Sequence, residues 1–210
     1  QSKHGDIVYV HFSGHGQQMK DVHNDEKDGL DECWIPYDAY RKPCEKDKGE
    51  KHLTDDEMNY YLNAIRDKIG DSGKMLVVID ACHSGGATRG DEDEVVRGVE
   101  DIFEAIKSFI WGTSADNGKA DVNPNAKENK ERWITISACK SDQVNIEMKS
   151  PAVGKLTYAI YNKVKENTGN DNDDFIRRIR KFVNSNTGSR PQYPEMTGET
   201  DRYRITDIIQ

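Results

Sequence analysis

The chain has 210 residues and a mass of 23.9 kDa, which suits one domain built around one sizeable core. Asp and Glu outnumber Lys and Arg by 38 to 30, and the net charge of −8 argues against a general nucleic-acid binder, which needs a basic face. No apolar run approaches the ~18 residues of a membrane span, and the N-terminus lacks the apolar stretch of a signal peptide. We therefore expect no nucleic-acid or membrane partner, and a cytoplasmic location; a secretion signal removed earlier would leave no trace.

The first elements in chain order predict a βαβ crossover. Residues 6–12 are β-branched and aromatic and predict a strand that ends at a Ser-Gly-His-Gly loop, residues 13–16. After a long loop, a capping box that begins at Thr54 and apolar residues at helical spacing predict a helix over 54–69. Residues 75–79, Met-Leu-Val-Val-Ile, predict a second strand. Its unbroken apolar run indicates burial on both faces, as in a parallel sheet covered by helices.

The second half of the chain continues the alternation of strands and helices. Apolar residues at helical spacing predict a helix over 99–111, and the polar tract that follows predicts an exposed, flexible loop at 112–130. The later elements are a strand at 133–138, helices at 156–164 and 175–183, and extended backbone at 190–194. The sum is an α/β domain that the polar tract divides into residues 1–111 and 131–210.

Both predicted strands end at residues that can carry chemistry. The first leads to His15 and the second to Cys82, and loops at the carboxyl ends of strands line the ligand crevice of open α/β sheets. Cysteine attacks as the thiolate, and a nearby imidazole removes its proton or stabilises the anion. The flanking glycines let the backbone approach a substrate closely, and the N–H groups of Gly16 and Cys82 are candidates for holding a developing oxyanion.

These residues also have interpretations other than catalysis. Cys82 alone would equally suit a buried structural thiol, but Asp80 before it and a glycine-flanked histidine on the neighbouring strand favour a nucleophile. A zinc site built from His11, His15, Cys82 and His83 matches no structural zinc spacing, and packing is preferred for His11 and His83. The remaining cysteines form no CxxC pair and are expected to be structural thiols: Cys33, Cys44 and Cys139.

Several segments carry a resemblance to a known family. Phe-Ser-Gly-His-Gly at 12–16 and Ile-Asp-Ala-Cys-His-Ser-Gly at 79–85 resemble the metacaspases and the related bacterial caspase-like cysteine peptidases. Further segments fit in family order: an acidic loop at 28–38, a helix entry at 52–57, and Ile-Ser-Ala-Cys-Lys-Ser-Asp-Gln at 136–143. The resemblance implies a caspase-like three-layer α/β fold, with a central, mostly parallel sheet and helices on both faces.

The resemblance also implies an activity, that of an endopeptidase cutting peptides and proteins after Arg or Lys through an acyl-enzyme. Cys82 is then the nucleophile, His15 the general base, and Ser13 with Asp80 the polar and acidic parts of the pocket for the P1 side chain. A carboxylate beside the nucleophile attracts a cationic side chain and repels an anionic one. Two alternatives stay open: a catalytically silent caspase-like adaptor, and a clan member that cleaves after another residue.

The family pattern further implies a processed chain. Residues 1–111 then form the large-subunit part, 112–130 the processing loop and 131–210 the small-subunit part. The family places a strand and a helix ahead of the Ser-Gly-His-Gly segment, and five residues precede the first strand here. We expect that part to be cleaved away, left out of this sequence, or carried on another chain. Basic residues of the polar stretch, Arg97 among them, offer self-cleavage sites. The favoured sites are Lys119, Lys127 and Lys130, which lie outside the predicted helix.

Calcium is the one cofactor that the resemblance raises. The acids that hold the ion in calcium-dependent members match Asp31, Asp55 and Asp56 here, but the fourth position falls on Arg89, with Asp91 nearby. A guanidinium in that place would repel the ion or pair with the acids itself. We therefore expect no required cofactor and weak or absent calcium activation.

Overall fold

A computed structural model describes most of the chain. The described residues are 2–21, 28–82, 94–103, 131–140, 143–166, 171–185 and 191–209. Both the predicted processing loop at 112–130 and the histidine at position 83 lie outside these residues. Within them, no helix is long and apolar enough to cross a membrane.

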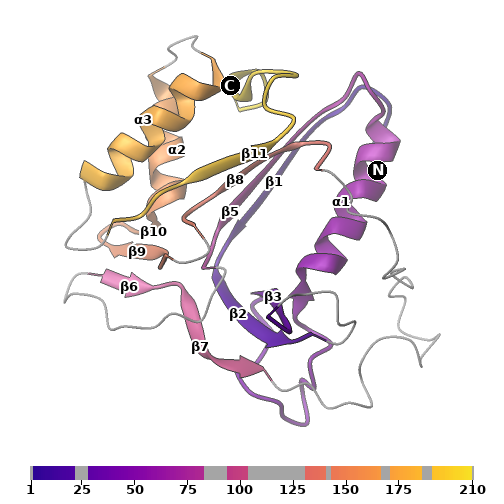
Figure 1. Ribbon diagram of the computed structural model, residues 1–210, viewed down its shortest axis with the longest axis vertical. Helices are drawn as coiled ribbons and strands as arrows, with labels where there is room; N and C mark the ends of the chain where they lie inside the picture. The colour runs from indigo at the N-terminus through magenta and orange to yellow at the C-terminus, as the bar shows by residue number, and fades with distance from the viewer. Residues whose placement is uncertain are drawn as a thin grey trace.

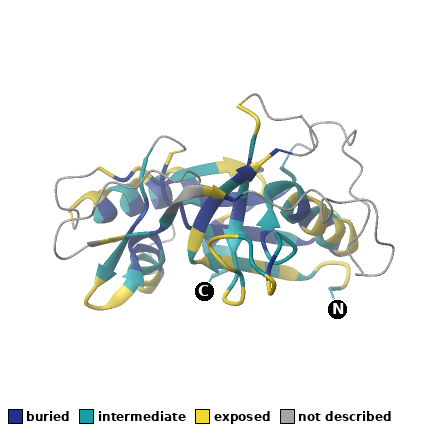
Figure 2. Ribbon diagram, turned by 90° about the horizontal axis from the view of Figure 1, so that it is seen from below, coloured by how far each residue is buried: buried dark blue, intermediate teal, exposed yellow. Residues whose placement is uncertain are grey.

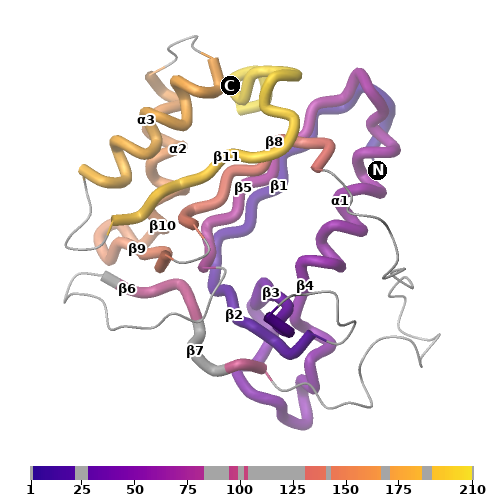
Figure 3. Tube along the Cα trace, in the orientation of Figure 1, coloured from indigo at the N-terminus to yellow at the C-terminus, as the bar shows by residue number. Residues whose placement is uncertain are grey.

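The centre of the fold is a four-stranded sheet (Figure 1). Its strands, in spatial order, are β1 (Ile7–Ser13), β5 (Lys74–Asp80), β8 (Ile134–Ser137) and β11 (Glu195–Gly198). The first three run parallel, and β11 runs antiparallel to β8. Figure 3 shows β1, β5 and β8 side by side along the middle of the molecule. The predicted strands at 6–12, 75–79 and 133–138 are therefore confirmed.

Helices cover both faces of this sheet. They are α1 (Asp55–Ile69), α2 (Lys155–Lys165) and α3 (Asn172–Ser185). The capping box is present at the start of α1, where Thr54 accepts from the Glu57 amide and the Glu57 carboxylate accepts from the Thr54 amide. The central strand alternates between the layers: Met75 packs toward α1, whereas Leu76 packs toward α2 and α3. This confirms the three-layer α/β fold.

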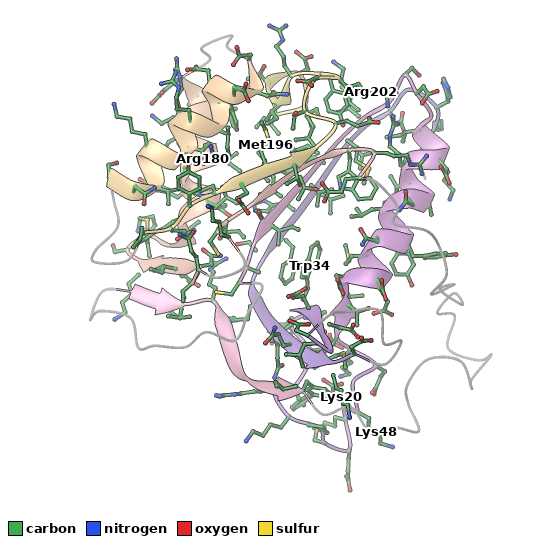
Figure 4. The ribbon with its side chains drawn as sticks, in the orientation of Figure 1. Lys20, Trp34, Lys48, Arg180, Met196 and Arg202 are labelled. Atoms are coloured by element: carbon green, nitrogen blue, oxygen red, sulfur yellow. The ribbon has the colours of Figure 1, made fainter. Side chains whose placement is uncertain are left out.

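The two cores lie on opposite sides of the sheet. In Figure 4, Trp34 lies on the α1 side and Met196 on the side of α2 and α3, and each packs against the corresponding core. Figure 2 shows that the buried positions concentrate on the strands and on the helix faces turned toward them. The unbroken apolar run of β5 is explained by this arrangement, because both of its faces are covered.

Two smaller sheets flank the carboxyl ends of β1 and β5. One has the order β4-β3-β2-β7, formed by β4 (Leu53–Thr54), β3 (Leu30–Ile35), β2 (His15–Lys20) and β7 (Gly98–Phe103). The other has the order β10-β9-β6, formed by β10 (Ala152–Gly154), β9 (Ile146–Lys149) and β6 (Glu94–Val96). A short 3₁₀ turn, η2 (Ile205–Asp207), follows near the C-terminus.

The structure corrects two local predictions. The Ser-Gly-His-Gly segment is not a loop, because β1 extends through Ser13 and β2 begins at His15. The helix predicted over 99–111 is wrong over residues 99–103, which form β7 and pair in parallel with β2. Phe103 is fully buried in a small cluster with Met19 and Cys33, so tertiary packing overrides the local helical spacing. Residues 104–111 lie outside the described residues.

Candidate active site

The register between β1 and β5 brings the two glycine-rich segments together. Ser13 lies directly opposite Asp80, and the Gly14 amide donates to the Asp80 carbonyl at 3.2 Å. His15 and Cys82 each follow two residues after this last pair. A β-carbon at position 16 would lie 1.8 Å from the Cys82 carbonyl oxygen, so only glycine allows this backbone approach.

The Cys82 thiol is held by the backbone of Asn145. Its side chain is buried, the Asn145 amide donates to Sγ at 3.0 Å, and Sγ lies 3.6 Å from the Asn145 carbonyl oxygen. Burial raises the pKa of Cys82 to about 11, although hydrogen bonds from the backbone of Asn145 and Arg97 act in the opposite direction. The resting group at neutral pH is therefore the thiol and not the thiolate.

His15 stands at the start of β2 with its side chain partly open to solvent. Partial burial lowers the pKa of His15, the Arg97 guanidinium lowers it further, and the Glu147 carboxylate acts in the opposite direction. The imidazole is thus neutral at pH 7 and able to accept a proton. Within the described ranges no hydrogen bond joins His15 to Cys82, whose sulfur is engaged by Asn145 instead.

Asp80 is a fully buried carboxylate with several donors. It accepts from the Thr157 amide at 2.8 Å, from the Thr157 hydroxyl at 2.5 Å and from the Asn145 side-chain amide at 2.8 Å. Thr157 lies in the first turn of α2, and the N-cap residue of this helix, Gly154, has no side chain to cap it. The negative charge of Asp80 therefore stabilises the positive N-terminal end of the helix dipole. Gln192 completes the arrangement by donating to the Asn145 side-chain oxygen at 2.9 Å.

A guanidinium occupies the space between Ser13, Asp80 and Glu147. The buried Arg97 side chain donates from one terminal nitrogen to Ser13 Oγ at 2.6 Å and to the Asp80 carbonyl at 3.0 Å. The same nitrogen lies 3.9 Å from Asp80 Oδ1. Arg97 Nε donates to Glu147 Oε2 at 3.1 Å. Polar and acidic groups thus surround an arginine side chain next to the cysteine.

The Arg97 main chain contacts the two amides predicted to hold an oxyanion, those of Gly16 and Cys82. The Arg97 carbonyl oxygen accepts from the Gly16 amide at 3.2 Å and from the Cys82 amide at 3.3 Å. The Arg97 amide donates to the Asn145 carbonyl at 3.0 Å. A carbonyl between these two N–H groups, with its side chain in an acidic pocket, is the arrangement in which a peptide bond would be polarised for attack.

The acids named for calcium lie elsewhere, around Cys33. Asp31 is buried on β3 and Asp55 begins α1. Burial raises the pKa of Cys33, and the carboxylates of Asp31 and Asp55 raise it further, so negative charge is concentrated there. In the part of the chain that the structure describes, no three His, Cys, Asp or Glu side chains are arranged to hold a metal ion, and Arg89 lies outside that part.

The remaining predicted residues have structural surroundings. His11 is exposed on β1, where its ring hydrogen-bonds Thr157 Oγ1 at 3.1 Å and Tyr9 Oη at 3.2 Å. The four cysteines, all within the described residues, form no disulfide with one another, as expected. The sequence did not single out three residues of the site: Asn145, which contacts Cys82, Glu147, which contacts Arg97, and Gln192, which contacts Asn145. They come from segments far along the chain and carry no local pattern, although Asn145 and Glu147 follow closely on the 136–143 segment.

The fold agrees with comparisons to known proteins. A model of the caspase domain matches residues 1–203. The chain belongs to the caspase-domain family. A metacaspase-1 of Schizosaccharomyces pombe is 28% identical to this caspase-domain chain, over 89% of the chain and 48% of that protein. A metacaspase-1 of Pyricularia oryzae is 25% identical, over 89% of the chain and 52% of that protein.

The chain therefore spans about half the length of the curated relatives it matches. A crystal structure of a Geobacter sulfurreducens protein shares the fold, with a TM-score of 0.57 and 19% identity over 99% of this chain and 73% of that one. The resemblance expected from the glycine-rich segments is confirmed.

The raised pKa of Cys82 predicts an unusual pH profile for its alkylation. Because the folded-state pKa is about 11, the thiolate fraction should still grow about tenfold per pH unit between pH 7 and pH 9. Peptide-level mass spectrometry after timed exposure of the uncleaved protein to iodoacetamide would measure the rate. Free cysteine, which levels off near its ordinary pKa, is the control. A plateau for Cys82 below pH 9 would contradict the prediction.

Proposed function

We propose that this chain is a cysteine endopeptidase that hydrolyses peptide bonds after Arg or Lys. The observation that carries the proposal is the binding of Arg97, whose carbonyl oxygen meets the amides of Gly16 and Cys82 while its guanidinium meets Ser13, Asp80 and Glu147. A peptide entering with a basic side chain would meet the same groups. Its carbonyl carbon would then lie at the cysteine, with the oxygen already polarised.

The proposed reaction follows from these positions. His15, neutral at rest, takes the proton of the Cys82 thiol, and the thiolate attacks the carbonyl carbon. The Gly16 and Cys82 amides stabilise the oxyanion of the tetrahedral intermediate. Protonated His15 gives its proton to the leaving amine, and the thioester is then hydrolysed by water with His15 again as base. A dyad suffices for this chemistry.

The acidic surroundings support a basic P1 residue. A carboxylate on a P1 aspartate would face the carboxylates of Asp80 and Glu147 and the Asp80 carbonyl, and like charges at short range penalise binding. The Glu147 contact is made to Nε, an atom that arginine has and lysine lacks. We infer that Glu147 favours Arg over Lys.

The test of the dyad uses fluorogenic peptides ending in Arg, Lys, Asp or Leu, followed over time. Arg and Lys peptides should be hydrolysed, and Cys82→Ala and His15→Ala should each remove the activity, with the double variant no worse than either single one. Cys44→Ala, at a half-buried free cysteine away from the dyad, is the matched control and should remain active. Activity retained by Cys82→Ala would refute the mechanism, and a preference for Asp would favour the other clan members.

The rival function is a catalytically silent adaptor. An adaptor does not require a cysteine and a histidine beside two amides that converge on one carbonyl oxygen, and this arrangement therefore favours the peptidase. Absence of hydrolysis together with no labelling of Cys82 by an arginyl electrophile would favour the adaptor.

Glu147→Gln tests the inference on Arg against Lys. Because this carboxylate is partly exposed, its loss should lower kcat/KM for Arg peptides by about 5- to 30-fold. The value for Lys peptides should fall by less, so the preference for Arg over Lys becomes smaller. Glu166→Gln, an exposed glutamate at the end of α2, is the matched control. An unchanged ratio of Arg to Lys hydrolysis would exclude Glu147 as a specificity residue.

Calcium should change the rate little. The support comes from the sequence: Arg89 falls where the resemblance places a further acid, and a guanidinium there would repel the ion. We propose that the peptidase rate in chelator and in millimolar calcium differs by less than about twofold. A large stimulation would show that Asp91 or another acid completes a site.

A further inference from the structure

Residues 94–98 lie in the candidate site in the way a bound peptide substrate would. Strand β6 pairs antiparallel with β9, with Glu94 opposite Met148, Val95 opposite Glu147 and Val96 opposite Ile146. The Arg97 amide continues the pairing by donating to the Asn145 carbonyl. Adding an extended segment to a sheet edge is a common mode of peptide recognition, in which the main chain supplies affinity and the side-chain pockets supply specificity.

The chain crosses the cysteine at a defined peptide bond. Up to Arg97 it belongs to the sheet of β9, and from Gly98 onward it belongs to the sheet of β2, where Gly98 pairs with Gly16 and Val99 with Gln17 (Figure 1). The Arg97 carbonyl, held by the Gly16 and Cys82 amides, lies between the two pairings. The backbone on both sides of the Arg97–Gly98 bond is thereby fixed.

We propose that this segment is the protein's own first substrate and that cutting the Arg97–Gly98 bond opens the groove to other peptides. The inference rests on the proposed function. Cys82 would attack the Arg97 carbonyl carbon, forming a thioester as the bond to the Gly98 nitrogen breaks. The Gly98 amine leaves with the proton that His15 took from the thiol. Water then hydrolyses the thioester, leaving a carboxylate on Arg97 and a free thiol on Cys82.

Until that cut, the segment blocks the site. A tethered strand competes with free peptide at an effective concentration of order millimolar, so peptides at micromolar concentration rarely displace it. The Cys82 thiol is hydrogen-bonded by the Asn145 amide and is neutral at rest, as expected of a nucleophile that has not yet attacked the bound segment. The sites favoured from the sequence, Lys119, Lys127 and Lys130, lie outside the described residues and stay predictions.

The bound segment also indicates which peptides the opened groove prefers. Val96, in the P2 position, is half-buried, whereas Val95, in the P3 position, is exposed. An apolar side chain at P2 should therefore raise the rate of peptide hydrolysis more than an apolar side chain at P3. The peptide Glu-Val-Val-Arg copies the segment and is the natural probe.

The experiment follows self-cleavage and peptide hydrolysis in the same samples of the purified chain. Mass spectrometry of intact protein, and of digests made with a Glu-specific protease so that Arg is not cut by the reagent, detects a new end at Arg97 and a new start at Gly98. We expect both ends in the wild type, neither in Cys82→Ala or Arg97→Gln, and slower cutting in Arg97→Lys. A triple variant, Lys119→Gln, Lys127→Gln and Lys130→Gln, is the matched control and should still be cut at Arg97.

Hydrolysis of Glu-Val-Val-Arg bearing a fluorophore separates this inference from the proposed function. The wild type should show a lag that ends as the 97–98 cut accumulates, with at least about a tenfold rise in rate. Hydrolysis of the probe without any cut at Arg97, or with a cut that does not change the rate, would overturn the inference and leave the peptidase intact. A Cys82-dependent cut at Arg97 without hydrolysis of the probe would likewise overturn the opening of the groove. Neither a cut nor hydrolysis of the probe would overturn the peptidase itself.

Discussion

The parallel pairing of β1 with β5 is the constraint on which the site depends. It runs without interruption from Ile7 opposite Lys74 to Ser13 opposite Asp80, and both strands then lead into glycine-rich segments. Successive side chains of a strand point to opposite faces of the sheet. A slip of one residue would therefore turn the Asp80 side chain away from α2 and take Ser13 and Asp80 out of reach of the Arg97 guanidinium. Burial of β5 on both faces makes such a slip costly, because its apolar residues fill two separate cores.

Asp80 ties the two halves of the chain to each other. The residue belongs to the segment before the polar stretch, whereas its donors Asn145 and Thr157 belong to the segment after it. A buried carboxylate without donors is costly by several kcal/mol, so the cysteine-bearing strand and the later segment stabilise one arrangement together. There is no room for a side chain at Gly154, where a β-carbon would lie 2.1 Å from Asp80 Oδ2. The helix therefore begins against the carboxylate, and the Thr157 amide donates to it directly.

Local patterns predicted the parts of the fold whose causes are local. The apolar run of β5 and the capping box of α1 need only a few neighbouring residues to be recognised, and both were correct. The helix prediction failed at residues 99–103 because their strand forms by pairing with β2, and no neighbouring residue in the sequence indicates that pairing. His15 and Cys82 could be singled out because glycines surround them. Glu147 could not, since an acid on a short strand becomes a pocket residue only through contact with an arginine fifty positions away.

Strand β9 lies between β10 and β6, so its backbone groups are paired on both sides. If β6 leaves, one side of β9 becomes an open edge, and unpaired N–H and C=O groups on an edge strand attract any extended chain, including another copy of the same molecule. An opened molecule would consequently be less soluble and shorter-lived than the intact one, and its working lifetime would depend on how quickly peptides cover the edge.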